Sequence, residues 1–153
     1  MAQYRETPYG VFNYLVDLSD SDAGETEIAG GFSEVSGLNM EITVAEYRAG
    51  NHKSNYVTKV PAIHKSGDIT LKRGVIGAEN LYNWLDQVRS GDVTAKRNVV
   101  IKLMSENHGE LAVQWKLINA MPIKWTGPTL TAKGGSDVAI EELVLAVEHI
   151  TQD

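Results

Sequence analysis

The sequence contains no cysteine, and its 153 residues include only two phenylalanines and four prolines. Without cysteine there is no disulfide framework and no thiolate metal site, so packing and backbone pairing must stabilise the fold. No stretch approaches the roughly 18 consecutive apolar residues of a transmembrane helix, and residues 1–10 hold no apolar run typical of a secretory signal. We therefore expect a chain that is soluble when made and whose monomer does not insert into a membrane.

Length and charge point to one domain with an uneven surface. A chain of this size predicts a single domain over residues 1–153. The formal net charge is -6, but residues 1–46 hold nine acids and one base, residues 47–102 ten bases and four acids, and residues 103–153 seven acids and three bases. Segregated charge would suit head-to-tail association of identical subunits. The alternative is that folding mixes these charges evenly.

Alternation of apolar and polar residues predicts two strands in the first third of the chain. Residues 11–18 alternate as a half-buried strand closed by the acidic loop at residues 19–24. Residues 38–45 give the clearest period of two, which places one face on a core and the other in water. The residues expected to face the core are Leu38, Met40, Ile42 and Val44. Those expected to face solvent are Asn39, Glu41, Thr43 and Ala45.

The middle of the chain predicts a long loop, a short strand and a helix. Residues 47–61 are polar and indicate an extended loop, and residues 69–74 a short strand. Helical spacing of Leu81, Trp84, Leu85 and Val88 predicts a helix over residues 78–89, which Gly91 ends.

The last third predicts further strands. Residues 99–103 and 111–117 alternate around a hairpin turn at residues 107–109. Residues 136–150 fit either a helix or a strand, and their composition favours a helix. Together these elements predict a mainly antiparallel β domain, a sandwich or partial barrel, with one α-helix.

No catalytic, cofactor or metal motif emerges. The four histidines lie in separate segments without metal-ligand spacing, although folding could still bring ligands together. Residues 20–25 resemble the start of a calcium loop but lack its distal glutamate, so a solvated turn is favoured. The Gly30-Gly31 and Gly134-Gly135 pairs indicate turns rather than phosphate loops, and the three tryptophans indicate core or interface anchors. The basic and aromatic run at residues 47–59 could bind nucleic acid, but an interface loop is favoured in an acidic chain.

Five segments, taken in chain order, carry a further signal. They are residues 32–50, the Lys72-Arg73-Gly74 turn with its strand at 69–74, the helix around 81–85, the tryptophan strand at 115–122 with its Asn-Ala-x-Pro bend, and the closing segment at 140–148. Together they resemble the phage tail-tube family, which includes the inner-tube subunits of contractile phages and of extracellular contractile injection systems. The resemblance implies that the closing segment is a strand. It also implies a structural subunit, not an enzyme, whose hexameric rings stack into a hollow tube driven by a contracting sheath.

The resemblance also implies the partners of the subunit and its location in the cell or particle. A sheath protein, baseplate and tube-terminating proteins, and a protein or DNA cargo in the lumen would be the partners. Assembly would take place in the cytoplasm, and the product would be a phage virion, a released particle or a cell-anchored apparatus.

Contact residues follow from the same resemblance. The arm at residues 1–9 and the loop at 47–61 match contact elements between subunits and rings, and Asn39, Glu41 and Thr43 become candidates for the lumen wall. The contact candidates are Tyr4, Arg5, Tyr47, Arg48, Gly50, Asn51, His52, Lys53, Lys59 and Pro61. Arg48 and Lys59 are expected to pair with acids of a neighbour. The chain has Lys59-Val-Pro-Ala62 where the family often has Lys-x-Pro-Gly, which leaves the conformation of that end of the loop undefined.

A small-ligand-binding or hydrolytic β-barrel is the alternative function, but the sequence offers no cluster of polar groups to build its pocket.

Overall fold

The computed structural model describes residues 4–18, 31–77 and 79–153. The acidic loop at 19–24, the calcium-like run at 20–25, Gly30, residues 1–3 of the arm and position 78 of the expected helix lie outside the described residues.

Strands dominate the described chain. The elements in order are β1 (Tyr14–Asp17), β2 (Glu34–Ser36), β3 (Met40–Tyr47), β4 (Thr58–Ser66), β5 (Ile69–Gly74), α1 (Asn80–Arg89), the 3-10 turn η1 (Val93–Ala95), β6 (Arg97–Met104), β7 (Leu111–Thr126), β8 (Ile140–Ala146) and β9 (His149–Gln152). This composition confirms the expected mainly β fold with one α-helix.

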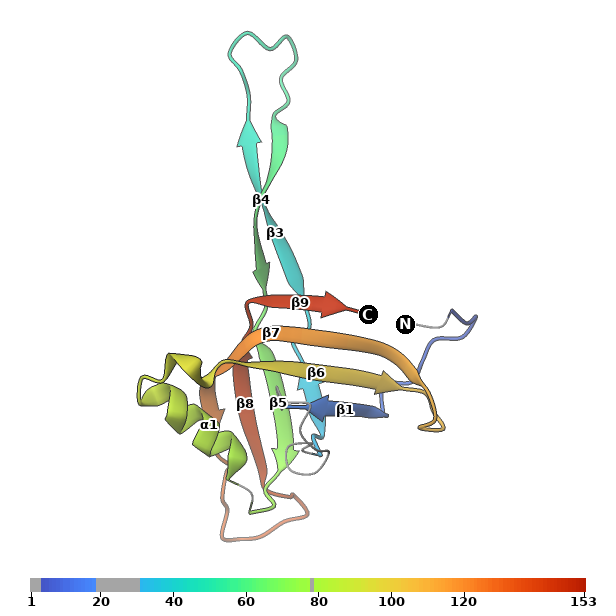
Figure 1. Cartoon of the computed structure of the whole chain (residues 1–153), viewed down its shortest axis with the longest axis vertical. Coiled ribbons are helices and arrows are strands. Elements are labelled where there is room, and N and C mark those ends of the chain that lie inside the picture. The colour runs from blue at the N-terminus through green and yellow to red at the C-terminus, as the bar shows by residue number, and fades with distance from the viewer. Residues whose placement is uncertain (1–3, 19–30, 78) are drawn as a thin grey trace.

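A seven-stranded antiparallel sheet forms the body of the molecule (Figure 1). Its order is β1-β6-β7-β8-β5-β2, and β9 pairs with β7 beside that path. The 16-residue β7 is shared: its first part pairs with β6 and β9, and its second part pairs with β8. Asn119 has φ 54° between the two parts, so the expected Asn-Ala-x-Pro bend lies inside one continuous strand. The turn expected at residues 107–109 joins β6 to β7.

Helix α1 covers part of this sheet and closes the core. It buries Leu81 and Trp84, and the Trp84 Nε1 donates a 2.7 Å hydrogen bond to the Ala95 carbonyl oxygen. Gly91, with φ 92°, follows the helix where an L side chain would be strained. The helix expected from the sequence is thus confirmed. Trp115 and Trp125 pack against the same core, as expected of anchors.

The C-terminal segment is a strand, so the helix favoured by its composition is wrong and the resemblance is right. β8 lies between β5 and β7 and bonds to both. Leu143 and Leu145 are fully buried on one face of it. Two neighbouring strands supply backbone partners and an apolar surface, which together outweigh a weak intrinsic preference for helix.

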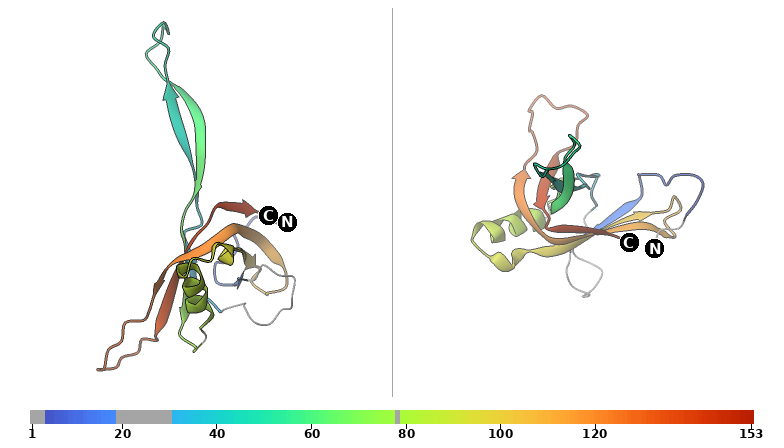
Figure 2. Two further views of the ribbon diagram at one scale, coloured as in Figure 1. Left: turned by 60° about the vertical axis from the view of Figure 1, so that its left-hand side comes forward. Right: turned by 90° about the horizontal axis from the view of Figure 1, so that it is seen from above.

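Strands β3 and β4 leave the body as a long two-stranded hairpin (Figures 1 and 2). Two expectations are corrected here. First, the apolar side of residues 38–45 does not face the core of this protomer, because every residue of β3 is exposed. Second, the expected loop at 47–61 is shorter, because Tyr47 belongs to β3 and residues 58–61 belong to β4. The unusual Lys59-Val-Pro-Ala62 sequence is therefore extended strand.

The hairpin departs from the sheet at a tight backbone crossing. Strands β2 and β5 pair below this crossing and β3 and β4 pair above it. Gly37 has φ 92°, and a Cβ placed there would lie 2.1 Å from the Asp68 carbonyl oxygen. Only glycine fits this crossing, because any side chain would meet the opposite backbone.

Candidate assembly surface

The hairpin has two chemically different faces. Directly opposite residues of an antiparallel pair share a face, and successive residues alternate between faces. Met40, Ile42 and Val44 therefore lie on one face, where Ile42 is opposite His64 and Val44 is opposite Pro61. We call this the apolar face, defined by Met40, Ile42, Val44 and Pro61. The other face, which we call the polar face, carries Glu41 opposite Lys65 and, nearer the tip, Ala45 opposite Val60. Thr43 lies on the same side of β3, at the register shift between Ile42 and Val44.

The apolar face has no cover within the described protomer. Met40, Ile42 and Val44 are 60%, 52% and 51% exposed. A row of large apolar side chains on an element that projects from the body and is exposed is typical of a surface that another protein covers. A two-stranded hairpin is also marginal by itself in water, so a partner would stabilise it.

The tip of the hairpin, residues 48–57, is ordered by its own side chains. The Arg48 guanidinium donates to the Ser54 carbonyl oxygen from Nε (3.2 Å) and to the His52 carbonyl oxygen from its terminal nitrogen (3.1 Å). The His52 ring meets the Tyr56 ring edge-on, with centroids 5.1 Å apart. Gly50 and Asn51 form the turn that the His52 N–H closes on the Ala49 carbonyl oxygen. These contacts bring together four of the expected contact residues, Arg48, Gly50, Asn51 and His52.

Lys59 and Pro61 lie on β4 below the tip. Lys59 is directly opposite Glu46 of β3, on the same side of the hairpin as the apolar face. Lys59 therefore has an acid of its own chain across the ladder, in addition to any acid of a neighbour. The tip itself is basic, since residues 47–57 contain Arg48 and Lys53 and no Asp or Glu.

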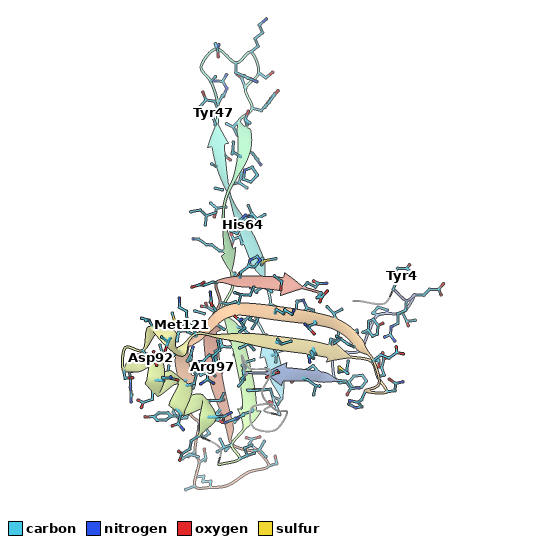
Figure 3. All side chains as sticks on the ribbon, in the orientation of Figure 1. Tyr4, Tyr47, His64, Asp92, Arg97 and Met121 are labelled. Atoms are coloured by element: carbon cyan, nitrogen blue, oxygen red, sulfur yellow. The ribbon has the colours of Figure 1, made fainter. Side chains whose placement is uncertain are left out.

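The N-terminal arm is held against its own protomer. The Arg5 guanidinium forms two hydrogen bonds with the Glu106 carboxylate, of 2.9 and 2.6 Å, and lies 3.7 Å from the centre of the Tyr9 ring. The hydrogen bond from Arg5 holds the pKa of Glu106 down to about 2. Tyr4 is 96% exposed. In Figure 3, Tyr4 and Tyr47 lie on separate projections, so the structure does not bring the arm and the hairpin together in one protomer.

The three lumen candidates share the base and polar face of β3. Glu41 and Thr43 are exposed strand residues. Asn39 precedes the strand, and its carbonyl oxygen accepts a 3.1 Å hydrogen bond from the Gly67 N–H. Its side chain lies over Gly67, where a Cβ would come within 2.2 Å of the Asn39 Oδ1. Asn39 is thus part of the hairpin base.

A buried polar network, which the sequence analysis did not predict, links the sheet to the helix. The Arg73 Nε donates a 2.5 Å hydrogen bond to the Glu141 Oε1, and an Arg73 terminal nitrogen donates to the Asn80 Oδ1 at 2.7 Å. The Trp125 Nε1 donates to the other Glu141 oxygen at 3.3 Å. The signal available in the sequence was the Lys-Arg-Gly segment, which forms the end of β5, but nothing in it identifies Glu141 as the partner of Arg73.

A surface hollow of about 410 Å³ lies between the arm and the β6–β7 turn, and most of its lining residues are exposed. Over residues 4–18, 31–77 and 79–153, no group of three or more His, Asp or Glu side chains could hold a metal ion. In the same ranges no helix is long and apolar enough to cross a membrane.

Comparison with solved structures gives the same architecture in known assemblies. A chain of the anti-feeding prophage cap (AFP tube terminating cap) superimposes with a TM-score of 0.82 and 25% identity, covering 100% of this chain and 95% of that one. A chain of the PVC sheath-tube complex in the extended state, from an extracellular contractile injection system, has a TM-score of 0.82 and 28% identity, covering 97% and 93%. Hcp1 from Flavobacterium johnsoniae shares the fold, with a TM-score of 0.52 and 12% identity over 91% and 93%.

Sequence comparison identifies the family. No curated protein matches the chain. The family described as T4-like virus tail tube protein gp19 matches residues 10–151, nearly the whole chain. This match confirms the resemblance found in the five sequence segments. The chain belongs to the T4-like virus tail tube protein gp19 family, and it is a structural subunit of a tube of the contractile-injection type.

Proposed function

We propose that copies of this chain form hexameric rings, and that the rings stack into the hollow inner tube of a contractile injection apparatus. A contracting sheath would drive the tube through a target envelope, with protein or DNA cargo in the lumen. The chain would serve as one tube domain, residues 1–153, with a contact arm at 1–9 and an inter-subunit hairpin in place of the expected loop at 47–61. In this role it has no catalytic function.

The observation that carries the proposal is the projecting β3–β4 hairpin, whose apolar face is left exposed by the residues that the structure describes. Its apolar face needs a protein surface, and its polar face suits water. A second copy can cover the apolar face of the first, while Glu41 and Thr43 of the polar face line a hydrated bore. Because each copy offers and receives the same contact at different surfaces, the association is heterologous and can close a ring or extend along an axis.

The ends of the sheet support the same arrangement. Within the part of the chain that the structure describes, strands β1 and β2 each pair with one neighbour at the ends of the sheet path. Unpaired strand edges present free N–H and C=O groups that another chain can join. Closure of strands from several subunits into one wall would satisfy these edges.

Partners other than the chain itself follow from its relatives. The relatives include chains of a sheath-tube complex, a sheath/tube terminator and a baseplate. We propose equivalent partners for this chain: a sheath outside the tube, a baseplate at one end and a terminator at the other. Assembly would take place in the cytoplasm, before the tube becomes part of a virion, a released particle or a cell-anchored apparatus.

Negative-stain electron microscopy of the purified full-length chain tests the proposal. We expect rings with six-fold symmetry in class averages, and stacks of rings with a constant diameter at high protein concentration. A chain that stays monomeric at every concentration, by sedimentation as well as microscopy, would contradict it. Addition of the sheath protein should then protect the outer surface of the tubes from proteolysis, and no protection would rule out the sheath contact alone.

A further inference from the structure

The side chain of Arg48 forms hydrogen bonds across the hairpin tip, where the backbone pairing between the two strands has ended. Cross-strand pairing between β3 and β4 ends at Tyr47 and Thr58, so residues 48–57 form a ten-residue connection. A connection of this length without internal bonds would sample many conformations. Arg48 lies at its start, and its guanidinium reaches across to the far side of the connection.

The contacts of Arg48 fix both sides of the tip. Its Nε and a terminal nitrogen donate to the Ser54 carbonyl oxygen at 3.2 and 3.1 Å, and the terminal nitrogen also donates to the His52 carbonyl oxygen at 3.1 Å. The planar guanidinium is suited to this, because its donors form a rigid fork that can hold two acceptors at once. A lysine has the same charge but lacks the fork.

Ser54 and His52 complete the same structure. The Ser54 N–H donates to the His52 Nδ1 at 3.3 Å, and the His52 ring packs edge-on against Tyr56. Three residues of the far side are therefore tied to one another and, through two carbonyl oxygens, to Arg48. The tip is an ordered element although its side chains are mostly exposed.

We propose that Arg48 is a positioning residue, which holds the hairpin tip in one conformation before the tip docks on a second copy of this chain. The inference rests on the proposed function, in which the hairpin makes contacts between subunits. Arg48 then acts within its own subunit, and it is not a partner for an acid of the neighbour. A preformed tip binds more tightly than a disordered one, because the ordering entropy is lost before the contact forms.

Lys53 is the residue at the tip that is available to a neighbour's acid. It is exposed, and the ion pairs found among residues 4–18, 31–77 and 79–153 do not include it. Arg48 and Lys53 thus carry the same charge within the same turn but have different roles. This difference makes Lys53 a matched control for Arg48.

Hydrogen exchange of the full-length chain tests the internal role. Amide exchange of residues 49–57 would be measured by mass spectrometry on unassembled subunits of the wild type and of the variants Arg48→Lys, Arg48→Gln and Lys53→Gln. We expect exchange to accelerate about five-fold or more in both Arg48 variants, because the bonds to the two carbonyl oxygens are lost. Lys53→Gln should exchange like the wild type. Unchanged exchange in Arg48→Lys and Arg48→Gln would overturn the proposal.

Tube yield, measured by sedimentation and negative stain, tests the docking role. Both Arg48 variants should leave most of the protein unassembled, although Arg48→Lys keeps the charge. Wild-type yield from Arg48→Lys, with loss only in Arg48→Gln, would instead show an ion pair to a neighbour and overturn the proposal. Faster exchange with wild-type yield in both would overturn it too. A wild type that forms no tubes overturns the proposed function and the docking role together, while the exchange comparison still decides whether Arg48 holds the tip.

Discussion

The guanidinium of Arg73 and the carboxylate of Glu141 form a buried ion pair, with Nε and Oε1 2.5 Å apart and side chains 2% and 8% exposed. Arg73 lies on β5 and Glu141 on β8, and the bonds to Asn80 and Trp125 extend the pair to α1 and β7. A charge buried in this way is tolerated only with its partners in place. The pair and its hydrogen bonds therefore tie α1 to β5, β7 and β8 in one specific arrangement.

We predict that Arg73→Met destabilises the subunit by about 3–5 kcal/mol, because it leaves the Glu141 carboxylate buried without its partner. The double change Arg73→Met with Glu141→Leu should recover a large part of this loss, since no unpaired charge remains. Chemical denaturation monitored by circular dichroism measures both. Lys72→Met is the control: it breaks an exposed ion pair to Glu34 of 3.4 Å and should cost about 1 kcal/mol or less. Equal losses for Arg73→Met and Lys72→Met would contradict a special role for the buried pair.

The bond between Arg5 and Glu106 predicts the pH range over which the arm stays in place. The pKa of Glu106 is lowered from 4.5 to about 2, first by the hydrogen bond from Arg5. A lowered pKa in the folded state contributes stability that is present above the unfolded value and is lost as the pH falls through the folded value. The arm should therefore stay attached at neutral pH and detach between about pH 4.5 and 2.

Glu106→Gln should release the arm at neutral pH, because a neutral amide cannot form the ion pair. Limited proteolysis within residues 4–10 would report the release. Glu110→Gln is the control, since Glu110 lies on the same turn and Arg5 forms its ion pair with Glu106. An arm equally protected in wild type and Glu106→Gln would show that other contacts hold it.

The two faces of β3 should respond differently to the same new charge. We predict that Ile42→Asp abolishes tube assembly, because it places a carboxylate on the apolar face that a second copy covers in the proposed tube. Thr43→Asp puts the carboxylate on the polar face, one residue away, and should allow assembly. Both residues are exposed in the subunit, so the unfolding free energy should change by about 0.5 kcal/mol or less in each. Sedimentation gives the tube yield; assembly of Ile42→Asp at the level of Thr43→Asp would be evidence against the covered apolar face.

Gly37 should be the least replaceable residue at the hairpin base. Gly37→Ala meets the Asp68 carbonyl oxygen at 2.1 Å and adopts a φ of 92°, so the backbone must move. We expect a loss of about 1–3 kcal/mol from the φ angle alone, with a larger total from the clash. Gly50→Ala is the control, because nothing lies within 4 Å of the Cβ it would add. Thermal unfolding compares the two, and similar melting temperatures would mean that the crossing adjusts without loss.

The sequence predicted those elements that a local pattern defines, such as helical spacing or a period of two. Helix α1 followed from the spacing of Leu81 and Trp84 and from Gly91 as its stop. Strand β3 followed from its period of two. Strand β4 was missed, because Val60, Pro61, Ala62 and Ile63 are four consecutive apolar residues and leave its sequence without a clear alternation.

Part of the candidate site was also predictable. The segment from Tyr47 to Lys53 is a projecting, exposed surface, as expected of a contact element. The internal bonds of Arg48 and Arg5 were not predictable. The acceptors of Arg48 lie four to six residues away, and Glu106, the acceptor of Arg5, lies 101 residues away. The position of a basic residue in a sequence does not identify the acceptor that it will contact after folding.

By itself, the sequence determined which residues of β3 share a face, where the helix ends, and to which family the chain is similar. The tertiary structure decided what covers each face. Residues 140–146 became a strand between two others, and the apolar side of β3 stayed exposed among the described residues. Arg48 and Arg5 formed hydrogen bonds within their own protomer. The physical reason is that periodicity reports the local geometry of the backbone, whereas burial and ion pairing depend on segments that only folding brings together.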